Sequence, residues 1–237
     1  MNEPAFRAAL AQSRAISGWL TESQSRILFE AAVSLRPGEV ALEIGSHHGK
    51  STVLLARALP AGASLVAVDP FEDSRWGGGR HALEIFQENL LRAGVRGRVR
   101  LIRSTSADAV GRWPSHATVS LLYIDGAHDY RSVSTDIALW QRHLSPEGTM
   151  LIHDAFSSAG VTRAVLRHLL PNNHIVYHGS SGSLVKFKPG TPTLTSRLRL
   201  ITRLAYFMRN VGVKIGLRHN SLTLVRLLGH RESGHPY

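Results

Sequence analysis

Histidine and aspartate side chains follow two apolar, strand-like segments of the chain. The stretch 123–130 reads Tyr-Ile-Asp-Gly-Ala-His-Asp-Tyr, so Asp125 and His128 come directly after one apolar segment. A second apolar segment ends in His153 and Asp154. An unperturbed imidazole titrates near neutral pH and can take a proton from a hydroxyl group. We therefore expect His128 to be a general base, with Asp125 and Asp154 as catalytic partners.

The two aspartates are also candidate ligands of a cation. If their segments are neighbouring strands, the carboxylates of Asp125 and Asp154 can converge on a divalent ion such as Mg²⁺, with His153 as a further ligand. A bound ion would lower the pKa of a coordinated hydroxyl and orient it. Two alternatives stay open: the acids only balance the charge of a cationic ligand, and His128 only makes a structural hydrogen bond.

A turn with two glycines follows the first apolar segment. It reads Glu-Ile-Gly-Ser-His-His-Gly-Lys-Ser over residues 43–51, and the glycines permit close approach of the backbone to a ligand. The dinucleotide pattern G-x-G-x-x-G is excluded because Glu43 stands where its first glycine would be. The phosphate-binding P-loop is excluded because Ile44 stands where the first glycine of that motif would be. A carboxylate at this place instead suits a ligand that carries an amino group.

Apolar segments alternate with amphipathic ones along most of the chain. A capping box at Thr21-Glu22-Ser23-Gln24 predicts the start of a helix. We expect strands at 40–45, 64–69, 99–102, 119–124 and 149–152, and helices at 51–59, 82–93, 131–144 and 161–170. Continuous apolar strands between helices indicate a parallel sheet covered on both faces. The runs 175–178 and 183–187 are joined too closely for a helical crossover and predict an antiparallel hairpin. The expected fold is a doubly wound, mostly parallel seven-stranded α/β sheet.

Two stretches carry a resemblance to a known family. Residues 43–51 resemble motif I of class I S-adenosylmethionine methyltransferases, E-x-G-x-x-x-G-x-[ST], and Asp69 and Ser106 follow the second and third strands as this family requires. Residues 125–137 are similar to the signature D-G-x-H-x-Y-x-x-V-x-x-D-[IL] of small bacterial enzymes grouped as methyltransferase family 24. The resemblance covers residues 40–188 and implies a Rossmann-like fold that binds S-adenosylmethionine.

The resemblance also implies a role for each residue around the cofactor. The glycine turn would hold the amino-acid end, Asp69 the ribose hydroxyls and Ser106 the adenine, while Asp125 would lie beside the sulfonium. The expected cofactor-binding residues are Glu43, Gly45, Ser46, Gly49, Ser51, Asp69, Ser106 and Asp125.

The acceptor atom is expected to be a hydroxyl oxygen. Nitrogen acceptors usually go with an N-P-P-Y-type loop after the fourth strand, and the sequence has none there. The loop 72–80 contains Trp76 between arginines and could form a lid over a sugar or an acidic substrate. The resemblance implies a small-molecule or saccharide acceptor, as in mycobacterial-type O-methyltransferases of methylmannose polysaccharide biosynthesis. Related sugar enzymes carry two adjacent acids where His153 precedes Asp154, so a metal-free mechanism stays open.

The last part of the chain has a different composition. The net charge is +11, and most of the excess lies after residue 190, in Arg197, Arg199, Arg203, Arg209, Lys214, Arg218, Arg226 and Arg231. Apolar residues recur there at spacings of three and four: Leu198, Ile201, Leu204, Met208 and Val211. The pattern predicts a basic amphipathic helix that packs on the domain or on a second copy in a homodimer. A membrane surface or an anionic ligand is the alternative.

Composition limits the remaining possibilities. There are no cysteines, which excludes disulfides, zinc–thiolate sites and a cysteine nucleophile and suits a reducing compartment. We expect a cytoplasmic protein without a membrane span. The expected segments are an N-terminal helical part (1–38), a cofactor-binding domain (39–189) and the basic tail (190–237). An RNA methyltransferase is a weaker alternative because the tail helix offers few aromatic side chains for base stacking. A non-catalytic cofactor-binding module is another.

Overall fold

The computed structural model describes residues 2–72 and 79–229 and is built around one seven-stranded sheet with the order β3-β2-β1-β4-β5-β7-β6. The strands are β1 (Val40–Ile44), β2 (Ser64–Val68), β3 (Val99–Ile102), β4 (Val119–Ile124), β5 (Leu144–Ile152), β6 (Ile175–Ser181) and β7 (Leu184–Pro189). Strands β1 to β5 are parallel, and β7 runs antiparallel to both of its neighbours. The predicted mostly parallel sheet with an antiparallel last hairpin is confirmed.

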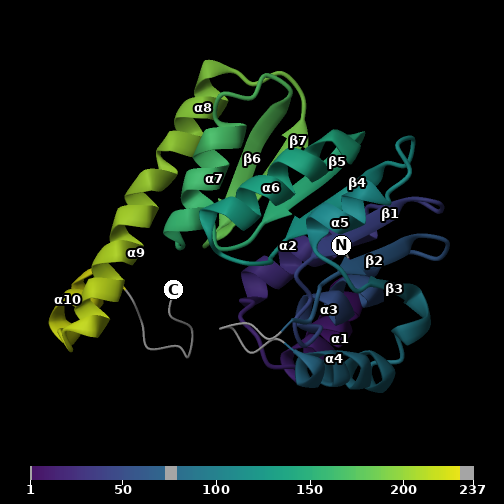
Figure 1. The fold of residues 1–237 in the computed structure, drawn as a ribbon. Coiled ribbons are helices and arrows are strands. Elements are labelled where there is room, and N and C mark those ends of the chain that lie inside the picture. The colour runs from purple at the N-terminus through teal and green to yellow at the C-terminus, as the bar shows by residue number, and fades with distance from the viewer. Residues whose placement is uncertain (1, 73–78, 230–237) are drawn as a thin grey trace.

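Helices cover both faces of the sheet (Figure 1). One face carries α1 (Glu3–Arg14), α2 (Glu22–Val33), α3 (Lys50–Ala58) and α4 (Arg80–Arg92). The other carries α5 (Ser106–Gly111), α6 (Tyr130–Trp140), α7 (Ala159–Leu169), α8 (Leu194–Ile201) and α9 (Arg203–Arg218), and α10 (Leu222–Leu227) packs against α9. None of the described helices is long and apolar enough to cross a membrane.

The apolar strands form two separate cores because successive side chains of a strand point to opposite faces. In β4, Leu121 and Tyr123 belong to the core under α1 to α4, whereas Leu122 and Ile124 belong to the core under α6 and α7. All four side chains are buried. This arrangement explains why the strands are apolar at nearly every position rather than at every second one.

Local signals set most element boundaries. The predicted capping box at α2 is present: the N–H of Gln24 donates to Oγ1 of Thr21 at 3.2 Å, and Oε1 of Gln24 accepts from the N–H of Thr21 at 2.9 Å. Strand β5 starts five residues before the predicted 149 because Leu144 pairs with Val119 ahead of a register shift. The short helix α5 was not predicted, since six residues are too few to show a period.

The loops after β1 and β4 meet at Gly45. This residue has a φ of +85°, and a Cβ atom placed on it would lie 2.3 Å from the carbonyl oxygen of Asp125 and 2.5 Å from Cα of Gly126. The N–H of Asp125 donates to the carbonyl of Ile44 at 2.8 Å. Only glycine permits this approach of two backbones, which places Asp125 against the turn 45–49.

Replacing Gly45 should therefore disrupt the meeting of the two loops. We expect Gly45→Ala to lower the free energy of unfolding by about 3 kcal/mol, from overpacking plus left-handed backbone strain, as measured by urea denaturation. The matched control is Gly38→Ala, since Gly38 has a φ of +86° but nothing within 4 Å of its added Cβ. That control should lose only about 1 kcal/mol. Equal losses of unfolding free energy in the two variants would show that the close approach of the two loops at Gly45 is not the cause.

Candidate active site

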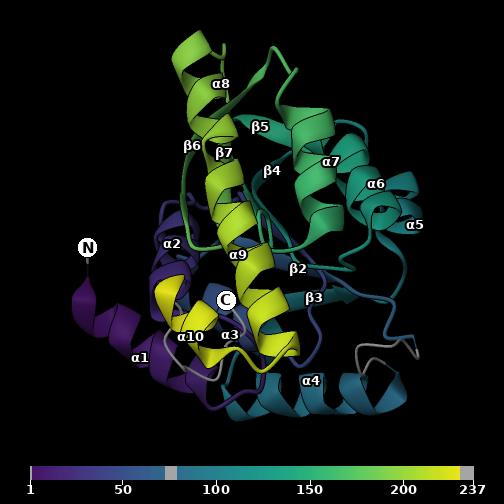
Figure 2. The same cartoon turned by 90° about the vertical axis from the view of Figure 1, so that its left-hand side faces the viewer.

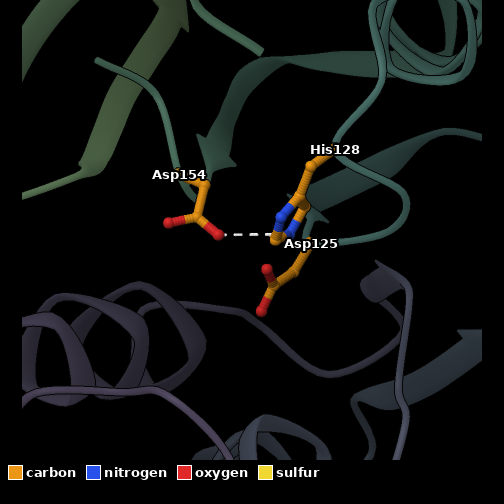
Figure 3. Close-up of side chains that lie close together, drawn as sticks. All are labelled: Asp125, His128 and Asp154. Atoms are coloured by element: carbon orange, nitrogen blue, oxygen red, sulfur yellow. Dashed lines mark ion pairs between the residues drawn. The ribbon is translucent and has the colours of Figure 1, made fainter. Parts of the chain in front are cut away.

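Three side chains meet at the carboxyl edge of the sheet (Figure 3). Asp125 and His128 follow β4, and Asp154 follows the neighbouring parallel strand β5. Nε2 of His128 lies 3.1 Å from Oδ2 of Asp154, and one potential ligand atom from each of the three residues lies within 4.8 Å of the others. The structure thus brings together the three residues that the sequence predicts to be catalytic.

Asp154 is held in an unusual backbone conformation. Its φ is +54°, in the left-handed region that non-glycine residues rarely adopt. The carboxylate is buried, and its Oδ1 accepts a hydrogen bond of 2.9 Å from Oγ of Ser157. Burial by itself would raise the pKa of Asp154, but hydrogen bonding to His153 and the charges of His153 and His128 outweigh burial and lower it. Asp154 is therefore a carboxylate over the physiological pH range.

His153 lies between the two aspartates. Its Nδ1 is 3.1 Å from Oδ1 of Asp125 and 3.5 Å from Oδ2 of Asp154. Burial alone would lower the pKa of His153, but the two carboxylates raise it well above its ordinary value. An imidazole whose Nδ1–H donates hydrogen bonds to carboxylates cannot use Nδ1 to bind a metal. Its other nitrogen, Nε2, is buried without a hydrogen-bond partner among the described residues.

Tyr123 positions Asp125, a role that the sequence did not indicate. Its hydroxyl donates to Oδ2 of Asp125 at 2.6 Å, and the ring is fully buried. Burial and the neighbouring charge of Asp125 raise the pKa of Tyr123 well above 10, so the phenol stays a donor. Asp125 is thus oriented by a phenol on one oxygen and by His153 on the other.

Glu43 lies fully buried beneath the turn that follows β1. Its carboxylate accepts hydrogen bonds from the hydroxyls of Ser51 (2.5 Å), Thr52 (2.5 Å) and Ser46 (3.1 Å). Burial raises the pKa of Glu43 to about 7, although the three hydroxyl donors act in the opposite direction. The described neighbours of Glu43 are therefore hydroxyls, and its contact with a ligand amino group stays a prediction.

Asp69 holds the same turn from the end of β2. Oδ2 of Asp69 accepts from the backbone N–H groups of Ser46 (2.8 Å) and His47 (3.0 Å), and Oδ1 accepts from the N–H of Phe71 (2.8 Å). Gly49 ends the turn with a φ of +86° as the N-cap of α3. The turn and the adjoining ends of β1 and α3 carry five predicted cofactor-binding residues: Glu43, Gly45, Ser46, Gly49 and Ser51. Contact of Asp69 with ribose hydroxyls stays a prediction.

Ser106 starts α5 beyond the end of β3. Its hydroxyl donates to Oδ1 of Asp136, a buried residue of α6 whose pKa is raised to about 6 by burial. Nε1 of Trp140 donates to the carbonyl of Ser106 at 3.2 Å. The described contacts of Ser106 therefore tie α5 to α6, and its contact with adenine stays a prediction. Residues 73–78 of the predicted lid at 72–80 lie outside the described part of the chain.

Comparison with known proteins agrees with this geometry. Residues 42–155, just under half of the chain, match the family model described as "Methyltransferase domain", methyltransferase family 24. Two solved structures are similar to the chain over most of its length: cofactor-bound Rv0187 from MTB (20% identity, TM-score 0.60, 78% of this chain and 89% of that one) and the O-methyltransferase TomG from Streptomyces achromogenes in complex with SAM (19%, 0.55, 77% and 86%). The chain has a Rossmann-like methyltransferase fold.

Curated relatives match only part of the chain. It is 32% identical over 126 residues to the uncharacterized protein y4gI of Sinorhizobium fredii, which corresponds to 51% of this chain and 13% of that protein. It is 29% identical over 137 residues to catechol O-methyltransferase B of Danio rerio, corresponding to 56% and 48%. The chain thus spans less than half the length of either relative. The family match over residues 42–155 includes β4 and β5, the strands that the site residues follow.

The C-terminal helix α9 supports the loop that carries Asp154. Nδ2 of Asn210 donates to the carbonyl of Phe156 at 2.9 Å, and Nζ of Lys214 donates to the carbonyl of Ser157 at 2.7 Å. The side chain of Asn210 is buried, so this contact is shielded from water. Sequence periodicity marks α9 as amphipathic but carries no signal for these two long-range contacts. The tail therefore contributes to the position of Asp154.

The buried Glu43 should make the stability of the protein depend on pH. Its pKa of about 7 lies above the ordinary 4.5, so its contribution is fully present below pH 4.5 and is lost as the pH rises to about 7. We expect Glu43→Gln to remove on the order of 3 kcal/mol of this dependence, measured by urea denaturation from pH 4.5 to 8. Part of the slope should remain, because Asp136 shifts in the same direction. The exposed Glu84→Gln is the control, and an unchanged slope in Glu43→Gln would refute the assignment.

Proposed function

We propose that the protein transfers the methyl group of S-adenosylmethionine to a hydroxyl group of a small molecule or saccharide. The observation that carries this proposal is the convergence of Asp125, His128 and Asp154 at the sheet edge, directly beside the glycine turn. Open α/β sheets bind their ligands at this edge. The similarity to catechol O-methyltransferase B supports oxygen as the acceptor atom.

His128 is the proposed general base. Oδ2 of Asp154 lies 3.1 Å from Nε2 of His128 and can accept a hydrogen bond from its N–H, so a neutral imidazole would carry its lone pair on Nδ1. The acceptor oxygen would form its bond to the methyl carbon as the sulfur–methyl bond breaks, and the hydroxyl proton would pass to His128. Asp154 would stabilise the resulting imidazolium, and S-adenosylhomocysteine would be the second product.

The glycine turn and its supports would bind the cofactor. Gly45 lacks a Cβ where the two backbones meet, and Glu43 and Asp69 fix the hydroxyl and amide groups of the turn. Ser106 would lie at the adenine end. Asp125 would lie beside the sulfonium and offset its positive charge.

A divalent cation such as Mg²⁺ is the second part of the proposal. Asp125 and Asp154 offer two carboxylates whose oxygens, with one ring nitrogen of His128, lie within 4.8 Å of one another, and carboxylate oxygens fit Mg²⁺. His128 would stay the base and would not be a ligand. A bound ion would lower the pKa of the acceptor hydroxyl. His153 would then orient the two carboxylates through its Nδ1 proton and would become a ligand only after losing that proton.

Within the hydroxyl class, we propose a mannoside of the kind methylated in methylmannose polysaccharide biosynthesis as the first acceptor to examine. This choice rests on the resemblance to small bacterial sugar methyltransferases. Catechols are the second class, suggested by the Danio rerio relative. We place the reaction in the cytoplasm, because a cysteine-free chain suits a reducing compartment.

Titration calorimetry tests the cofactor first. We expect S-adenosylmethionine and S-adenosylhomocysteine to bind with dissociation constants on the order of micromolar, with and without Mg²⁺, and NADH not to bind. Both expected ligands share the adenosyl and amino-acid groups that the turn and the sheet edge would hold. Binding of NADH alone, or of none of the three, would overturn the proposed cofactor and the catalytic roles that depend on it.

Replacing His128, the proposed base, should lower turnover and leave cofactor binding unchanged. We expect His128→Ala to lower turnover on screened mannosides and catechols by about 100-fold, because proton removal from the hydroxyl would lose its acceptor. Asp154→Ala should also lower turnover, and cofactor affinity by calorimetry should stay nearly unchanged in both variants. The control is His81→Ala, since this side chain is 84% exposed on α4.

Treatment with a chelator tests the role of a metal independently of the role of His128 as the base. If a divalent ion takes part, chelation should lower the turnover of the unaltered protein, and added Mg²⁺ should restore it. Turnover that is insensitive to chelation would remove the metal from the proposal and leave His128 as the base. Full turnover in His128→Ala would remove His128 from the mechanism instead.

A further inference from the structure

Helices α8 and α9 form one nearly continuous rod with an apolar stripe on its outer side. Thr202, which joins them, keeps a right-handed helical conformation (φ −59°, ψ −19°). The stripe consists of Leu194, Leu198, Ile201, Met208 and Ile215, spaced as on one side of a helix. All five are exposed, Leu194 by 74% and Met208 by 64%. Such a row of large, solvent-exposed apolar side chains indicates a binding surface.

The opposite side of the rod is fixed to the domain. Leu200 and Val213 are buried, and Leu204 and Phe207 pack against the core under α6 and α7. The hydrogen bond from Asn210 to the carbonyl of Phe156 adds a polar anchor. Figure 2 looks onto the rod from outside and shows it lying in front of the sheet. The stripe therefore faces outward because the inner side is already occupied.

The rod carries arginines without any acid. From residue 190 to residue 229 the sequence contains no aspartate or glutamate, whereas arginines occur at 197, 199, 203, 209, 218 and 226. Hydrogen bonds from Arg197 to Asn173 (2.7 Å) and from Arg209 to the carbonyl of Leu228 (2.7 Å) end on neutral oxygens. None of these six arginines forms an ion pair with a carboxylate in the described part of the chain. At 100° per residue, Arg197 and Arg209 border the apolar stripe on opposite sides.

We propose that this outer face docks on an anionic phospholipid surface. A lipid interface offers apolar chains to the stripe and phosphate groups to the arginines, which is the combination that interfacial amphipathic helices use. A second copy fits less well, because pairing two such faces would bring arginines of the same sign together with no acid between them. The rod would lie on the membrane, held to the domain by its inner side. This interaction goes beyond the proposed methyl transfer and does not depend on it.

Vesicle co-sedimentation of the full chain tests the docking. We expect at least about tenfold more protein on vesicles of phosphatidylcholine with phosphatidylglycerol than on phosphatidylcholine alone, and less at high salt. Soluble glycerophosphate should not compete, since it lacks the apolar chains. Failure to bind the anionic vesicles, or equal binding to both kinds, would overturn the proposal.

Matched variants assign the binding to the rod. Leu198→Glu combined with Met208→Glu should reduce binding about tenfold, whereas Leu91→Glu, at a residue 63% exposed on α4, should not. Arg197→Glu with Arg209→Glu, the two arginines that border the stripe, should also reduce binding, against the equal charge change of Arg96→Glu with Arg100→Glu. Circular dichroism checks that all four proteins are folded.

Sedimentation velocity tests the alternative that a second copy of the chain covers this face. A dimer that Leu198→Glu abolishes, in a protein that does not bind anionic vesicles, would make this face a self-association surface and refute lipid docking. A monomer that binds anionic vesicles through the rod supports the proposal. Neither result requires turnover, so failure of the docking and failure of the proposed methyl transfer can be told apart.

Discussion

The parallel pairing of β4 with β1 on one side and β5 on the other is the constraint on which the site depends. Parallel strands end at the same edge, so this pairing brings Asp125 and His128 next to Asp154, although the chain between them is a helix and a whole strand. The same pairing brings the loop after β4 against Gly45. One sheet edge therefore holds both the candidate cofactor turn and the candidate catalytic residues.

Buried and half-buried polar groups at this edge are arranged in two layers. The lower layer consists of groups that support others: Tyr123 under Asp125, three hydroxyls on Glu43, and the backbone amides of the turn on Asp69. The upper layer consists of Asp125, His128 and Asp154: His153 links the two aspartates, and His128 pairs directly with Asp154. Because a buried charge without a partner is costly, each carboxylate is placed where donors already exist. The geometry of the upper layer thus depends on residues that would not touch a substrate.

The two sides of the C-terminal rod have different surroundings. Its inner side closes the core under α6 and α7 and fixes the loop of Asp154 through Asn210. Its outer side carries the apolar stripe and the arginines. The single helix α9 thus carries both the contacts to the loop of Asp154 and part of the exposed stripe.

Much of this protein could be predicted from its sequence by itself, because the decisive signals are local. The alternation of apolar strands with helices indicated the parallel sheet, the short link after residue 178 indicated the hairpin, and the signatures at 43–51 and 125–137 indicated which residues lie at the strand ends. The roles of supporting groups were decided only by tertiary structure. Nothing near Tyr123, Asn210 or Lys214 in the sequence marks their partners, and the position of His153 between two carboxylates exists only when β4 and β5 lie side by side. Hydrogen bonds and shifted pKa values of this kind depend on distances between residues far apart in the chain, and only the folded chain sets those distances.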